Sequence, residues 1–80
     1  MKRKRIGQSP IVVTDICMGT MTFGLQCDAP QSNAILDAAA AAGIDFLDAA
    51  DVYPLGGGRN TAGRTEQIVG DWLRGKRHDF

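Results

Sequence analysis

Two apolar strand segments alternate with two helical segments in this sequence, and short connections join them. Residues 16–18 and 44–49 have the character of strands, and residues 28–42 and 65–74 that of helices. Strands that alternate with helices over short connections pair in parallel through right-handed crossovers. Because two strands alone cannot form a parallel sheet that buries both faces, we expect the opening part of a larger α/β structure, with a third strand after Phe80.

The clearest helix signals begin at Asp28. Asp28 and Gln31 have the spacing of a capping box, and Pro30 suits a first helical turn. A start at Ala29 is an equal alternative, because the residue before a proline avoids helical backbone. Gly43 is well placed to stop the helix. The face expected to pack on a sheet consists of Ile35, Ala38, Ala39 and Ala42.

A hairpin is expected over residues 3–14, where the turn-forming cluster 7–10 separates two short extended segments. The apolar run that ends at Gly19 suits a strand buried on both faces, and Cys17 within it is expected to be a buried small hydrophobe. Residues 54–63 are expected to form a loop. The second helix has an apolar stripe made of Ile68, Val69, Trp72 and Leu73, with Trp72 in the core.

Composition and charge exclude several classes of protein. The 80 residues carry a formal net charge of zero that is unevenly spread, and neither nucleic acid nor a membrane is an expected partner. Residues 2–5 are all basic, but four charges without interleaved aromatic residues are a weak nucleic-acid footprint, and a solvated strand is preferred. No apolar run follows them, which argues against a secretory signal, and the apolar stretch 38–42 is too short to cross a bilayer.

The cysteine pattern argues against a metal site. Cys17 and Cys27 lie ten residues apart, and His78 is the only histidine, so a zinc ligand set is not expected. Two cysteines without a secretory signal are expected to remain reduced, which favours the cytoplasm.

The run from Gly43 to Tyr53 brings a carboxylate and a phenol to the carboxyl end of a strand. Asp48 shares the face of Ile44 and Phe46, which is an unusual place for a carboxylate in simple packing. In a barrel of alternating strands and helices, chemistry takes place at this end. The structural alternatives are a turn- or helix-capping role for Asp48 and loop packing for Tyr53.

Several stretches, taken in order, resemble the N-terminal segment of the aldo-keto reductases. They are the hairpin, the sequence Gly19-Thr20-Met21-Thr22-Phe23-Gly24, the Asp48 and Tyr53 pair, and Gly63-Arg64-Thr65-Glu66-Gln67-Ile68-Val69-Gly70. The resemblance implies a (β/α)8 TIM barrel, of which residues 1–80 would supply one incomplete part. Residues 3–14 would be the capping hairpin, 15–43 the first βα unit and 44–75 the second.

The resemblance also implies roles for individual residues. Tyr53 matches the acid that protonates a carbonyl oxygen while hydride arrives from NADP(H), and Asp48 matches the carboxylate that supports an active-site lysine near the cofactor. Phe23 would wall the substrate pocket. The loop that approaches the nicotinamide consists of Gly19, Thr20 and Met21. The expected function is therefore the reduction of small aldehydes or ketones to alcohols.

The family's lysine and histidine match no position in residues 1–80, because Lys76 and His78 both precede the place of a third strand. A free phenol has a pKa near ~10, and lowering it to ~7 requires roughly 4 kcal/mol of preferential phenolate stabilisation. A nearby cation can supply this, whereas Asp48 alone would raise the pKa. The isolated chain is thus expected to be inactive without the remainder of the barrel. The alternative is a non-enzymatic regulatory or docking protein of the same family.

Overall fold

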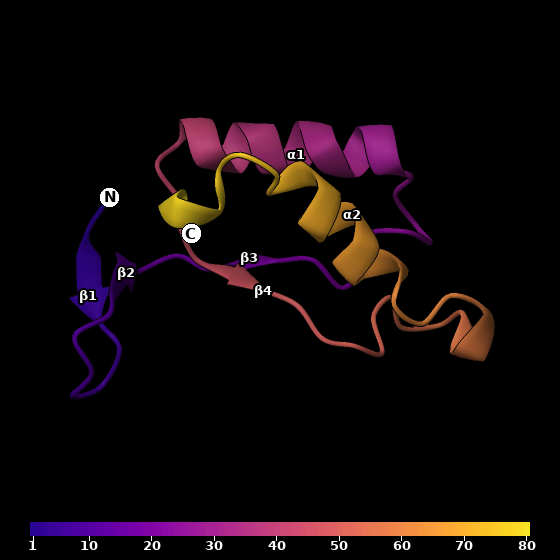
Figure 1. The fold of residues 1–80 in the computed structure, drawn as a ribbon, viewed down its shortest axis with the longest axis horizontal. Coiled ribbons are helices and arrows are strands. Elements are labelled where there is room, and N and C mark those ends of the chain that lie inside the picture. Colours follow the sequence, from indigo (N-terminus) through magenta and orange to yellow (C-terminus); the bar gives the residue numbers. More distant parts are fainter.

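The computed structural model describes all 80 residues and contains two small sheets and two helices (Figure 1). The strands are β1 (Arg3–Arg5), β2 (Val12–Thr14), β3 (Met18–Gly19) and β4 (Leu47–Asp48). The helices are α1 (Ala29–Ala41) and α2 (Arg64–Trp72), with short 3-10 turns at Gly58–Asn60 and Arg77–Asp79. The first sheet is the antiparallel hairpin β1–β2, and the second pairs β3 with β4 in parallel. The predicted hairpin and the parallel pairing across α1 are confirmed.

The two ends of the β3–β4 pair have different neighbours. In Figure 1 the hairpin lies at the amino ends of β3 and β4, and the loops that follow these strands lie at the opposite end. Within the ladder, Met18 is opposite Leu47 and Gly19 is opposite Asp48. Because the pairing is parallel, both strands deliver the residues that follow them to one edge.

The boundaries of α1 follow from local contacts. Asp28 Oδ1 accepts a hydrogen bond from the backbone N–H of Gln31 at 2.9 Å, and Gln31 Oε1 accepts one from the N–H of Asp28 at 3.1 Å. This is the predicted capping box, and the helix begins at Ala29. Beyond the other end, Gly43 has a φ of 92°, which side-chain-bearing residues rarely adopt. The predicted glycine stop is confirmed.

The core lies between the two helices and one face of β3–β4. It is centred on four buried side chains, Phe23, Leu36, Val69 and Trp72, against which Met18 and Leu47 pack. The predicted core position of Trp72 is confirmed, and its indole Nε1 donates to Asp37 Oδ1 at 2.8 Å, which ties α2 to α1.

The predicted packing face of α1 is wrong in most of its members. The buried residues of the helix are Ser32, Leu36 and Ala39, whereas Ile35, Ala38 and Ala42 are exposed. Ser32 can be buried because its hydroxyl donates to the carbonyl of Asp28 at 2.7 Å. Because serine is a polar residue, the sequence pattern did not indicate that Ser32, Leu36 and Ala39 form the buried face of α1.

The strands β3 and β4 are shorter than predicted and are covered on one face only. Met18 and Leu47 point towards the helices, and alternation along the strands places Cys17, Gly19 and Asp48 on the opposite face, where all three are exposed. The expectation that Cys17 is buried is therefore wrong. The physical reason is that nothing in the 80 residues packs over this second face.

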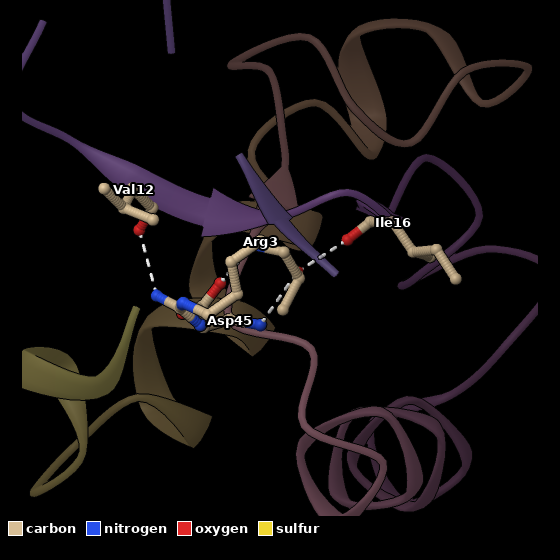
Figure 2. Close-up of polar contacts among 5 residues, drawn as sticks. Arg3, Val12, Ile16 and Asp45 are labelled. Carbon is tan, nitrogen blue, oxygen red and sulfur yellow. Dashed lines mark hydrogen bonds and ion pairs between the residues drawn. The ribbon is translucent and has the colours of Figure 1, made fainter. Parts of the chain in front are cut away.

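A polar cluster joins the hairpin to the segment before β4 (Figure 2). The Arg3 guanidinium pairs with the Asp45 carboxylate and donates to the carbonyl of Val12 at 3.0 Å. Asp45 Oδ1 also accepts a hydrogen bond from the backbone N–H of Thr14 at 2.9 Å, and the Thr14 hydroxyl donates to the carbonyl of Ile16 at 2.8 Å. The hydrogen bond from the Thr14 N–H is the main cause of a lowered pKa at Asp45, and the nearby Arg3 guanidinium lowers this pKa further.

We expect Asp45→Ala to lower the free energy of unfolding by about 1–3 kcal/mol at neutral pH, because it leaves the Thr14 N–H without its acceptor and removes the ionic partner of Arg3. Since folding lowers the pKa of Asp45, its stabilisation is complete above its ordinary value of 3.8. It is lost as the pH falls through the lower pKa of the folded state. Urea denaturation of both proteins from neutral pH to about pH 2 should show their stabilities converging.

Asp15→Ala is the matched control, because Asp15 is exposed and its side chain takes part in neither ion pair of the chain. Its stability should stay within about 0.5 kcal/mol of the unmodified chain. A difference between Asp45→Ala and the unmodified chain that does not change with pH would contradict an ionised Asp45 as the cause.

Candidate active site at the carboxyl ends of β3 and β4

Gly19 and Asp48 are neighbours at the ends of their strands, because they are partners in the β3–β4 ladder. The loop after β3 begins with Thr20 and Met21, and the loop after β4 leads to Tyr53. All five residues predicted from the sequence therefore belong to the strand ends or the loops at one edge. The ladder brings Gly19 and Asp48 into register, and a hydrogen bond adds Thr20.

Thr20 is fully buried, and its hydroxyl donates to the carbonyl of Asp48 at 2.6 Å. The carbonyl of Thr20 in turn accepts a hydrogen bond from the backbone N–H of Phe23 at 3.1 Å. Thr20 thus connects the beginning of one loop to the end of the neighbouring strand. Because its side chain has no exposed surface, Thr20 itself is not available to contact a bound molecule.

The Asp48 carboxylate is on the uncovered face, and the two ion pairs of the chain involve other acidic residues. Its charge nevertheless reaches Cys17. Although Cys17 is an exposed residue, burial of its thiol is the larger cause of a raised pKa, and the negative charge of Asp48 is the second. Asp48 and Cys17 therefore share one face of the β3–β4 pair.

The backbone of Tyr53 is held on both sides. Its N–H donates to the carbonyl of Ala50 at 3.1 Å, and its carbonyl accepts from the N–H of Gly63 at 3.0 Å. The next residue, Pro54, is fully buried and follows a cis peptide bond. Tyr53 itself is half-buried, and its hydroxyl makes no hydrogen bond within the chain. The phenol is thus anchored through its backbone and has a hydroxyl available to a partner.

The backbone at Gly19 is open to solvent. A Cβ atom placed on Gly19 would meet no other atom of the chain within 4 Å, and Met21 is 43% exposed. The Asp48 carboxylate is exposed at the same strand ends.

The largest groove of the molecule lies elsewhere. It has a volume of about 420 Å³ and is lined mainly by apolar side chains of the hairpin, β4 and α2, and it includes none of the five candidate residues. The candidate site is open because nothing in the chain covers the face of β3–β4 that carries Asp48.

The environments of Phe23 and Lys76 also bear on the site. Phe23 is 1% exposed in the core, so the expectation that it walls a substrate pocket is wrong. The Lys76 ammonium lies 3.9 Å from the centre of the Trp72 ring, where the ring's negative face attracts it. No group of three or more His, Cys, Asp or Glu residues is arranged to hold a metal ion. No helix has the length and apolar character required to span a membrane.

The hydrogen bond from the Thr20 hydroxyl could not be predicted from the sequence. Thr20 and Asp48 are 28 positions apart in the sequence, and no local sequence pattern predicts a contact over that separation. The nearest signal is the type of residue: threonine is a β-branched hydrogen-bond donor directly after a strand, where a neighbouring strand also ends.

Comparison with known proteins identifies a family that this chain resembles over most of its length. Residues 15–80 match the model of the aldo/keto reductase family. The chain is 42% identical over 73 residues to protein Tas of Escherichia coli (strain K12), covering 91% of this chain and 21% of Tas. It is 40% identical over 73 residues to the uncharacterized oxidoreductase YrpG of Bacillus subtilis (strain 168), covering 91% of this chain and 22% of YrpG.

A plant protein is also similar. The chain is 36% identical over 75 residues to a probable voltage-gated potassium channel subunit beta of Oryza sativa subsp. japonica, which corresponds to 92% of this chain and 21% of that protein. The chain therefore spans about a fifth of the length of these relatives.

Proposed function

Because this chain belongs to the aldo/keto reductase family, we propose that it forms the N-terminal hairpin and the first two βα units of a (β/α)8 barrel that reduces aldehydes or ketones with NADP(H). The name of the relative YrpG as an oxidoreductase supports the class of reaction. The observation that carries the proposal is the parallel β3–β4 ladder, which brings Gly19 and Asp48 together at the end of the strands that leads to Tyr53.

In this proposal Tyr53 is the proton donor. Its hydroxyl is not used within the chain, and its backbone is held by Ala50 and Gly63, so the phenol can point a proton at the oxygen of a bound carbonyl compound. A bound NADP(H) supplies the hydride. Gly19 and Met21 form the surface against which the cofactor lies, and the open space beside Gly19 supports this assignment.

Asp48 acts in this proposal through a cation rather than on Tyr53 directly. A carboxylate alone disfavours the phenolate, whereas a carboxylate that holds an ammonium group beside the phenol favours proton donation. Lys76 is engaged by the Trp72 ring, so we assign the supporting cation to another part of the barrel. The uncovered face of β3–β4 is where the remaining strands would close the site and exclude water.

We expect the 80-residue chain alone to oxidise no NADPH in the presence of 4-nitrobenzaldehyde, because the cation beside Asp48 is missing. The same chain joined to the part of YrpG that follows the matched segment should give turnover. The assay follows the loss of NADPH absorbance. Turnover by the 80-residue chain clearly above that of its Tyr53→Phe variant would show that these residues are sufficient and would contradict the proposed division of the site.

A non-enzymatic regulatory or docking subunit is the second candidate, and the similarity to a probable potassium channel subunit beta favours it. The two candidates differ in the joined protein described above. A reductase oxidises NADPH when an aldehyde is added. A regulatory subunit binds NADPH, seen as quenching of protein fluorescence, without catalytic turnover.

A further inference from the structure

Two fully buried threonines of this chain, Thr20 and Thr65, each donate a hydrogen bond to a backbone carbonyl at 2.6 Å. Thr65 binds the carbonyl of Phe23 and so ties the first turn of α2 to the core. Thr20 instead binds the carbonyl of Asp48, directly at the candidate active site.

The hydrogen bond from Thr20 restrains the backbone of Asp48, a residue whose side chain forms no ion pair within the chain. The Asp48 carboxylate is exposed. Its position therefore depends on the orientation of its own backbone at the end of β4, which has only two residues in the ladder. Thr20 is suited to this task, since its β-branched side chain has few rotamers.

We infer that Thr20 is a positioning residue, whose hydroxyl fixes the backbone of Asp48 and thereby the place of its carboxylate in the active site. This inference rests on the proposed function, in which Asp48 holds the cation that assists Tyr53. It assigns Thr20 an indirect role, because a side chain without exposed surface cannot itself touch a cofactor. Small displacements of active-site groups slow catalysis strongly, since a shift of ~1 Å can lower a rate ~10²-fold.

Cys17 provides a probe of the Asp48 carboxylate that needs no turnover. Burial of the thiol and the charge of Asp48 both raise the pKa of Cys17, so the pH at which Cys17 becomes reactive reports whether the carboxylate is in place. The rate of iodoacetamide alkylation at Cys17 can be followed against pH in the full 80-residue chain, with peptide mass spectrometry to separate Cys17 from Cys27. Asp48→Asn gives the size of the shift that follows from loss of the carboxylate charge. Because that charge raises the pKa of Cys17, its removal should shift the Cys17 profile to lower pH.

Thr20→Val keeps the shape of the side chain and removes the hydroxyl, and it should shift the Cys17 profile in the same direction as Asp48→Asn. Thr20→Ser retains the hydroxyl and should restore the unmodified profile. Thr65→Val is the matched control, because it removes a hydrogen bond of the same length from an equally buried threonine, whose acceptor is the carbonyl of Phe23 rather than that of Asp48. It should lower stability as Thr20→Val does and leave the Cys17 profile unchanged.

Two results would overturn the inference. They are a Thr20→Val profile equal to that of the unmodified chain where Asp48→Asn shifts it, and a Thr65→Val shift as large as that of Thr20→Val. The proposed function fails by a different result, which is full turnover of the joined enzyme without the Tyr53 hydroxyl. The thiol measurement is independent of turnover, so the two failures are distinguishable.

Discussion

Replacing Leu36 with alanine is expected to lower the free energy of unfolding by about 2–5 kcal/mol. Leu36 has no exposed surface and is one of the four central core residues. Domains have stabilities of about 0.05–0.15 kcal/mol per residue, which is roughly 4–12 kcal/mol for this length. At the lower end of this range the substitution removes most of the total, and a substantial population of unfolded chain is then expected at room temperature. Urea denaturation followed by the fluorescence of Trp72 measures this loss.

Ile35→Ala is the control for this experiment, because it removes a side chain of similar size from the preceding position of α1. Ile35 is 36% exposed and lies outside the core cluster, so we expect a change of no more than about 1 kcal/mol. The comparison also tests the correction to the packing face. If Ile35→Ala proved as destabilising as Leu36→Ala, the face predicted from the sequence would be the correct one.

Removing the hydroxyl of Tyr53 is expected to have the largest effect on catalysis. In the protein made by joining this chain to the remainder of YrpG, Tyr53→Phe should lower kcat by about 10²–10⁴, which is the range for loss of a general acid. KM should change little. Because the hydroxyl makes no hydrogen bond within the chain, the thermal midpoint of unfolding should also remain unchanged. Steady-state NADPH oxidation with 4-nitrobenzaldehyde and a melting curve are the two measurements.

Asp51→Asn is the matched control on the same loop. Asp51 is an exposed carboxylate two residues before Tyr53, and neither ion pair involves it. Its removal should leave kcat within about twofold, a difference of less than ~0.5 kcal/mol. If Tyr53→Phe retained the kcat of the unmodified joined protein, Tyr53 would not be the proton donor, and the proposed mechanism would be wrong.

Features that depend on neighbouring residues could be predicted from the sequence. The start of α1 at Ala29 follows from the capping box of Asp28 and Gln31, and its end follows from Gly43. These signals act within a few residues, so each is visible in a short stretch of sequence. The hairpin over residues 3–14 and the apolar stripe of α2 belong to the same class.

Features that depend on what packs against a residue could not be predicted. Cys17 has the sequence context of a buried residue and is exposed, because only one face of β3–β4 is covered. Leu36, rather than Ile35, faces the core because α2 and Trp72 approach α1 from that side. A helical pattern of small apolar residues is compatible with more than one face, and only the partner selects among them.

The same distinction applies to the candidate site. The order of residues from Gly43 to Tyr53 was enough to predict that a carboxylate and a phenol follow one strand, and to support membership of the family, because both depend on local spacing. The pairing of Gly19 with Asp48 and the bond from Thr20 to the Asp48 carbonyl arise only when two strands separated by a helix meet. Contacts across 28 residues are set by tertiary packing, which alone decided how Asp48 is held.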